Sequence, residues 1–162
     1  MTRRTLVGSL AAAAALPSKS APRHSHTEWR PKLGVLGKYT PANVAFAQEA
    51  GFTNMILDAG QHSTLDAATL TDTQIEEIRR TLTQHKMHVS AFQLTTNHID
   101  PDPDRRTSTN TYFVRAIELA GKLGVPYIGT ASGKNPHQSF TQQVDEVVRT
   151  YSEHYFPACE RN

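Results

Sequence analysis

Four apolar runs alternate with four helical patterns from residue 32 onward, and this alternation constrains the fold more than any other feature. The runs predict strands at 32–37, 54–60, 88–96 and 125–133. Helical patterns follow each run in turn, at 39–51, 70–86, 107–124 and 139–162. Because strands that alternate with helices of this length form βαβ crossovers, the sequence predicts an α/β fold with a parallel sheet.

The expected helices carry recognisable end signals and apolar stripes. The end signals are Thr40 before Pro41, the capping boxes Thr71–Gln74 and Ser139–Gln142, and the terminal glycines Gly51 and Gly124. The stripes expected to be buried are Phe46 with Ala50; Ile75, Ile78 and Leu82; Phe113, Ile117, Ala120 and Leu123; and Val144, Val148, Tyr151 and Tyr155. Pro157 is expected to bend or end the last helix.

The length of the four strand–helix units helps to choose between two possible architectures. They could form an open doubly wound sheet or part of a (β/α)8 barrel. The units occupy about 130 residues, and doubling this gives roughly the 250 residues of a complete barrel. We therefore expect about four parallel (β/α) units that form half of a TIM barrel.

The N-terminus resembles an export signal. Arg3 and Arg4 precede a short alanine-rich stretch that ends near Leu16, which is too short to span a membrane of roughly 30 Å. We interpret residues 1–26 as a twin-arginine signal peptide with a linker, residues 27–162 as the folded part, and the location as periplasmic or otherwise extracytoplasmic. No stable membrane insertion is expected.

Charge and cysteine content narrow the function classes. Residues 1–26 hold four basic residues and no acidic one, so the formal charge of +2 becomes −2 without them. A mildly acidic domain is poorly suited to binding a phosphate backbone, and we expect no nucleic-acid partner. The single cysteine, Cys159, excludes a disulfide within the chain.

The candidate binding residues lie at or just after the predicted strand ends. Asp58 ends the second strand, Asn97 and His98 follow the third, and Lys134 follows the fourth. In a parallel barrel these ends share one face, where barrel enzymes hold their substrates. We expect Asp58, Asn97, His98 and Lys134 to bind substrate. Asp58 could instead bond backbone amides of its own turn, and His98 could be a loop histidine.

The loop at 97–106 also carries three aspartates between prolines. Asp100, Asp102 and Asp104 lack the glycine and the distal glutamate of a calcium loop, so we expect them to cap, solvate or turn the chain rather than bind metal. Arg105 and Arg106 are expected on the surface near the third helix. No sequence motif marks a catalytic residue.

Two stretches carry a family resemblance. "NHIDPDPDRR" and "AIELAGKLGVPYIGTASGKNPHQS" resemble the sugar phosphate isomerase/epimerase family with a xylose isomerase-like TIM barrel, in its N-terminal half. The resemblance implies a small-molecule sugar or sugar derivative as the partner. It also implies, for the complete family, a divalent metal (Mn, Mg, Co or Zn) held by two glutamates, an aspartate and a histidine on strands five to eight.

The residues that would correspond to those implied metal ligands are absent from this sequence. We expect a truncated form of a sugar isomerase or epimerase with no cofactor and no isomerase activity of its own. The alternative is a non-catalytic half-barrel or carbohydrate-binding fragment. A DNA-repair relative of the same superfamily is disfavoured, since the fourth strand ends "GTASG" without a histidine. Uncovered sheet edges are expected to favour self-association.

Overall fold

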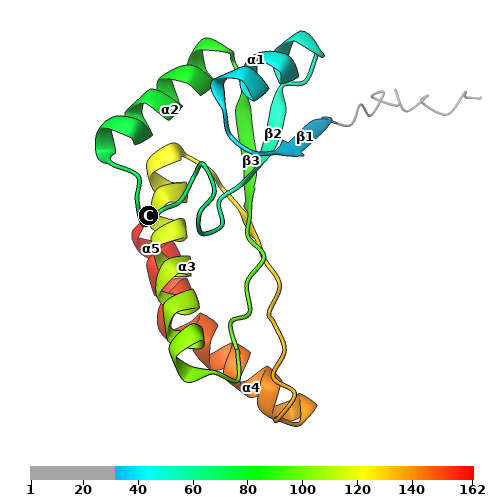
Figure 1. Ribbon diagram of the computed structural model, residues 1–162, viewed down its shortest axis with the longest axis vertical. Coiled ribbons are helices and arrows are strands. Elements are labelled where there is room, and N and C mark those ends of the chain that lie inside the picture. Colours follow the sequence, from blue (N-terminus) through cyan, green and yellow to red (C-terminus); the bar gives the residue numbers. More distant parts are fainter. Residues whose placement is uncertain (1–31) are drawn as a thin grey trace, which may run out of the picture. The chain divides into compact units, whose positions relative to one another are not determined.

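Four parallel strands form one sheet in the order in which they occur along the chain. The structure is a computed structural model that describes residues 32–162; the Arg3–Arg4 pair and the expected leader lie outside the described residues. The strands are β1 (Gly34–Gly37), β2 (Asn54–Asp58), β3 (His88–Gln93) and β4 (Ile128–Gly129), and the sheet order is β1-β2-β3-β4. Figure 1 labels β1, β2 and β3. The predicted α/β class with a parallel sheet is confirmed, and the arrangement is that of half a TIM barrel.

Helices follow each strand and cover one side of the sheet. They are α1 (Pro41–Glu49), α2 (Asp72–Gln84), α3 (Pro103–Leu123) and α4 (Phe140–Thr150), followed by a π-helical turn, η1 (Tyr151–Tyr155), and α5 (Phe156–Arg161). Met55 and Leu57 of β2 and Phe92 of β3 are at most 1% exposed under these helices. No helix within residues 32–162 has the length and apolarity that a membrane span requires.

The predicted helix signals are confirmed at most ends. The Thr40 side chain caps α1, the capping boxes at Thr71 and Ser139 are both formed, and Gly124 ends α3 in the left-handed conformation with φ 68°. Helix α3 begins at Pro103, earlier than the predicted residue 107, because Asp102 acts as its N-cap. An aspartate followed by proline is a strong helix start, whereas this pair was expected to belong to the loop.

Two of the four predicted stripes are buried in full or nearly so. Ile75, Ile78 and Leu82 are buried, as are Phe113, Ile117 and Ala120, while Leu123 is partly buried. The stripe of Phe46 and Ala50 was predicted wrongly, since Phe46 is 65% exposed and Ala50 is exposed as well. The last stripe is wrong in part: Val144 is 42% and Val148 58% exposed, whereas Tyr155 is buried.

The side of α4 that packs on the protein is polar. Glu146 and Thr150 are buried instead of the two valines, and the Glu146 Oε1 atom lies 3.3 Å from Nε of Arg106 on α3. Helical periodicity identifies an apolar face but not the element that covers it.

The last predicted strand and helix also differ from the structure. Strand β4 has two residues rather than the predicted 125–133, with backbone bonds of 2.9 Å from Phe92 N to Tyr127 O and from Leu94 N to Gly129 O. The helix continues past Pro157, which was expected to bend or end it. The wider turn of η1 just before Pro157 accommodates a residue that has no N–H and whose ring would clash in a regular α-helix.

Candidate functional site

The carboxyl ends of the strands carry the predicted site residues, but these residues lie in different surroundings. Asp58 is the last residue of β2, and its carboxylate accepts a hydrogen bond of 3.0 Å from Gly60 N. This hydrogen bond to a backbone amide of its own turn is the role that was given for Asp58 as the alternative to substrate binding. The same turn is fixed to α3 by Tyr112, whose hydroxyl donates to Ala59 O at 2.8 Å. Burial raises the pKa of Tyr112 to about 12, so this hydroxyl stays protonated near neutral pH.

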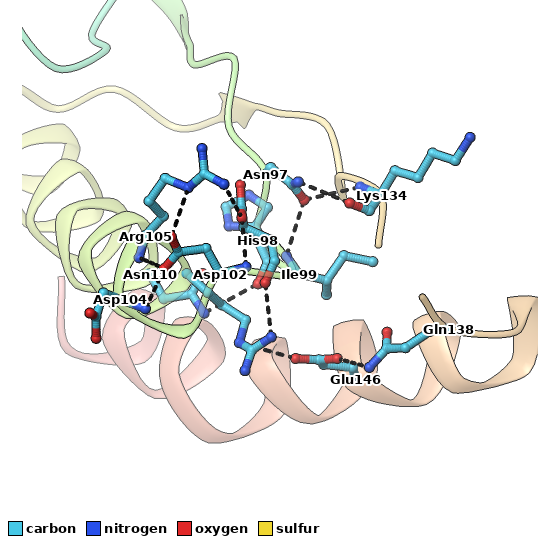
Figure 2. Close-up of polar contacts among 12 residues, drawn as sticks. Asn97, His98, Ile99, Asp102, Asp104, Arg105, Asn110, Lys134, Gln138 and Glu146 are labelled. Atoms are coloured by element: carbon cyan, nitrogen blue, oxygen red, sulfur yellow. Dashed lines mark hydrogen bonds and ion pairs between the residues drawn. The ribbon is translucent and has the colours of Figure 1, made fainter. Parts of the chain in front are cut away.

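Asn97 ties the loop after β3 to the loop after β4. Its Nδ2 donates to Lys134 O at 2.9 Å, and its Oδ1 accepts from Lys134 N at 3.0 Å (Figure 2). The contact is close because Gly133, with φ 92°, has no side chain: a Cβ there would lie 1.9 Å from Asn97 Oδ1. Gly133 therefore allows the loop after β3 and the loop after β4 to approach each other. The exposed Lys134 side chain extends away from the other labelled residues (Figure 2).

His98 is completely buried. The rings of Phe113, Tyr155 and Tyr151 surround it edge-on, with centroids at 4.7, 5.2 and 5.8 Å. This enclosure lowers the pKa of His98 below its usual value, because burial disfavours the charged ring, although the Asn110 side chain acts in the opposite direction. His98 is therefore neutral near pH 7.

Both ring nitrogens of His98 have hydrogen-bond partners. The Tyr155 hydroxyl lies 2.7 Å from Nδ1 and donates its own hydrogen to Asn110 Oδ1 at 2.7 Å, so Nδ1 carries the proton. Nε2 then accepts from a threonine hydroxyl, with Thr96 Oγ1 at 2.9 Å and Thr130 Oγ1 at 3.1 Å. We call His98, Tyr155, Asn110, Thr96 and Thr130 the histidine cluster. It joins the ends of β3 and β4 to α3 and η1.

The aspartates of the same loop shape the chain. Asp102 accepts from the backbone N–H groups of Asp104 and Arg105 at 2.9 and 3.1 Å, and the bond from Arg105 is the main cause that lowers the Asp102 pKa. Asp100 accepts from Asp102 N at 2.9 Å and lies 3.4 Å from the Arg105 guanidinium. The predicted turn and capping roles are confirmed for these two aspartates. Arg105 is exposed as expected, whereas Arg106 is only 28% exposed and pairs with Glu146.

One polar cavity opens between the loops after β2 and β3 and the first turns of α3. Its volume is about 320 Å³. Its polar lining comprises Gln61, Thr95, Thr96, Asn97, Asp100, Arg105, Ser108, Thr109 and Tyr112. Asn97 is the predicted site residue that lines it; Asp58, His98 and Lys134 do not. We call this space the loop cavity. Its amide, hydroxyl and guanidinium groups are hydrogen-bonding partners for a polyol.

Sequence reasoning missed Gln61, Arg105, Ser108 and Thr109 as cavity residues. Gln61 lies three residues beyond the end of β2, a position that could have been included with Asp58. The other three lie on α3, because the helix begins earlier than predicted. The role of Asn97, His98, Asp58 and Lys134 in substrate binding stays a prediction.

The donor set does not fit a divalent metal. Within residues 32–162, no three side chains of His, Cys, Asp or Glu come together in a group that could hold an ion. Both nitrogens of the buried His98 already bond to the histidine cluster. We therefore assign no metal ligand among these residues.

Comparisons with known proteins agree with the fold. The family model described as xylose isomerase-like TIM barrel matches residues 44–161. A sequence search of curated proteins gave no significant match.

Three solved structures illustrate the similarity. A D-psicose 3-epimerase, crystallised in the presence of D-fructose, is 12% identical with a TM-score of 0.62, over 79% of this chain and 48% of that one. A xylose isomerase domain protein from Planctomyces limnophilus is 16% identical (TM-score 0.62; 80% and 49% covered), and a 3-keto-D-glucoside 4-epimerase from E. coli is 15% identical (TM-score 0.61; 76% and 50% covered). The chain spans about half the length of each.

Proposed function

Because the chain belongs to the xylose isomerase-like TIM barrel family, we propose that it binds a sugar or sugar derivative as part of an isomerase or epimerase. The observation that carries the proposal is the loop cavity, which places polar groups at the carboxyl ends of parallel strands. This is the face on which TIM-barrel enzymes bind their substrates. The epimerase and isomerase titles of the similar structures support the same class of ligand.

The loop cavity suits a hydroxylated ligand better than an apolar one. Gln61 and Asn97 supply amide groups that donate and accept, and Ser108 and Thr109 supply hydroxyls. Arg105 adds a cation that can donate two parallel bonds to a phosphate or carboxylate. Its side chain is held over the cavity by Asp100 and Asp102, each with an oxygen 3.4 Å from a guanidinium nitrogen. A phosphorylated sugar would therefore gain one more contact than the free sugar.

The reaction implied by the family is proton transfer next to a carbonyl group. We assign to residues 32–162 the binding and orientation of the substrate. The divalent metal that the resemblance implies does not fit the donor set found here, and we derive no step through it. The second candidate, a carbohydrate-binding unit without turnover, is favoured by the same observation. The two candidates share the binding site and differ only in whether a bound sugar is converted.

The proposal includes a location outside the cytoplasm. It rests on the Arg3–Arg4 pair and the alanine-rich stretch that follows it. A reporter fused behind residues 1–26 should be exported, and replacing both arginines with lysine should stop its export. Export that continues unchanged in the lysine variant would contradict the twin-arginine assignment.

Binding can be tested by titrating the full chain with ketoses and aldoses, with and without a phosphate group, by calorimetry. We expect saturable binding that weakens about tenfold in Gln61→Ala, since the variant loses contacts made by one amide. Gln84→Ala removes the same group from an exposed position on α2 and is the matched control. Product analysis of the same mixtures distinguishes turnover from binding alone. Failure of every sugar to bind, or equal weakening by both variants, would refute the proposal.

A further inference from the structure

The exposed large apolar side chains of residues 32–162 are confined to the two outer units of the sheet. At the β1 end they are Leu33, Leu36 and Phe46; at the β4 end they are Tyr127, Phe140, Val144, Val148 and Phe156. Their exposed fractions run from 42% for Val144 to 81% for Phe140. Residues 47–126, which contain β2, α2, β3 and α3, contribute none to this set. We call the two groups the β1 patch and the β4 patch. Large exposed apolar side chains that gather on the same few elements mark a contact region.

Each patch lies beside an open edge of the sheet. Among the described residues, β1 pairs with β2 alone and β4 pairs with β3 alone, and all pairs are parallel. An edge strand presents unpaired N–H and C=O groups that can bond to another strand. A strand added to either edge in the parallel sense would continue the sheet.

The β4 edge has a partly apolar cavity beside it. A cavity of about 560 Å³ lies beside β4, lined by Ile117 of α3, Ile128 of β4, and Tyr151 and Phe156 of the last helical segments. Val35 of β1 packs against the core on the helix-covered side of the sheet. Because side chains of an extended chain alternate, Leu33 points to that same side. A β1 strand laid along β4 would direct Leu33 toward this cavity.

The helices lead to the same pairing. Helix α1 contacts α2, α2 contacts α3, and α3 contacts α5, so the helix layer follows chain order. Continuing the layer beyond either end brings an α1 helix beside an α4–α5 segment. Phe46 on α1 would then meet the exposed stripe of Phe140, Val144 and Val148 on α4.

We propose that a second copy of this chain covers both patches, with β1 of each copy paired to β4 of the other. The interface is isologous, because β1 of each copy meets β4 of the other, and the two-fold axis closes the ring. Four strands from each copy give eight, the number in a closed parallel barrel. The similar structures are about twice as long as the part that this chain covers. The proposal stands independently of the sugar-binding function.

The first test is the mass of the full chain in solution, measured by light scattering and sedimentation at several concentrations. A closed pair has twice the mass of one chain of 17.9 kDa and does not grow further with concentration. A chain that stays monomeric at about 100 μM, far above the dissociation constants of stable interfaces, would overturn the proposal. A series of ever larger assemblies would overturn it as well, because it shows that the contact does not close.

Two variants test which surfaces meet. Phe46→Asp places a charge in the β1 patch and Val148→Asp places one in the β4 patch; both side chains are exposed, so the fold of one copy tolerates the change. Each should raise the dimer dissociation constant at least about tenfold. Thr73→Asp adds the same charge at an exposed position of α2 and should leave the constant unchanged. If only one patch variant had an effect, the β1 patch would not meet the β4 patch and the proposal would be wrong.

Mixing the two patch variants provides a test that misfolding cannot imitate. In a mixed pair, the unaltered β4 patch of the Phe46→Asp chain meets the unaltered β1 patch of the Val148→Asp chain. One of the two contacts is then intact, so the mixture should form more dimer than either variant alone at equal total concentration. Dimer formation in the mixture no greater than in the separate variants would contradict the pairing of β1 with β4.

Discussion

Asn97 and His98 are neighbours in the chain, yet their side chains occupy opposite kinds of environment. Asn97 lines the open loop cavity among amide, hydroxyl and charged groups. His98 is fully buried, bonded through both nitrogens and enclosed by three aromatic rings. The difference shows that one strand end can serve two purposes, because successive residues point in different directions. The histidine cluster holds the strand ends in place, and the loop cavity beside it is free to meet a ligand.

The largest effect on stability is expected for His98→Ala. The change removes a buried ring and leaves the Tyr155, Thr96 and Thr130 hydroxyls without their central partner. We expect the free energy of unfolding to fall by about 4 kcal/mol in urea denaturation. His88→Ala, at an exposed position that begins β3, is the control and should change it by less than about 0.5 kcal/mol. A loss below about 1 kcal/mol for His98→Ala would show that the cluster does not hold the fold.

Gly133→Ala, which alters the contact with Asn97, should have the next largest effect on stability. The new Cβ would collide with Asn97 Oδ1, and alanine is strained at φ 92°. We expect destabilisation of about 3 kcal/mol and separation of the loops after β3 and β4. Gly51→Ala separates the two causes, since its φ is also positive at 84° but no atom lies within 4 Å of the added Cβ. Equal effects of the two variants would mean that the contact with Asn97 is unimportant.

Tyr155→Phe tests the polar part of the histidine cluster without changing its packing. The variant keeps the ring but leaves the His98 Nδ1–H group and Asn110 Oδ1 buried without their shared partner. We expect a loss of about 2 kcal/mol in the free energy of unfolding. Tyr127→Phe removes a hydroxyl from a side chain that is 72% exposed and should be close to neutral. Similar values for both would argue that the buried hydrogen bonds contribute little.

The smallest effect is a dependence of stability on pH. Since burial lowers the pKa of His98 in the folded protein, the unfolded chain binds the proton more readily below pH 6.5, its usual value. Stability from this residue is therefore complete above pH 6.5 and is lost as the pH falls through the folded-state pKa. Asp72 and Asp102 stay ionised in this range, because their pKa values lie below 3.8.

The pH effect is measured by comparing unfolding at pH 7.5 and 5.0 in the wild type and in His98→Gln. The two proteins differ only at residue 98, so the difference between their pH dependences isolates His98. The wild type should lose more stability on acidification. A larger loss in His98→Gln would reverse the sign and contradict a lowered pKa.

The sequence predicts much of the fold because its local signals act over short distances. The parallel sheet follows from the strand–helix alternation, and the caps at Thr40, Thr71 and Ser139 are read from adjacent residues. The burial of Val144 and Val148 was predicted wrongly, since periodicity does not show whether a covering element is present. The loop cavity was not predicted, because Gln61 and Arg105 line one cavity only when the loop after β2 and the start of α3 fold together. His98 was expected just after a strand ending at residue 96, but β3 ends at Gln93. The direction of the His98 side chain depends on Tyr155, far along the chain.

The π-helical turn η1 has a consequence for how the last segment is aligned. Each residue of an α-helix rotates the chain by about 100°, and a π turn contains one more residue than the α-helical turn that it replaces. The turn therefore works as an insertion of one residue that the helix absorbs by a shift of rotational phase. The same residues wound as a regular α-helix through Tyr151–Tyr155 would place Pro157 at the angle that the buried Ala158 now holds. The number of residues in this turn thus determines, together with the sequence of α5, which small residue packs against α3.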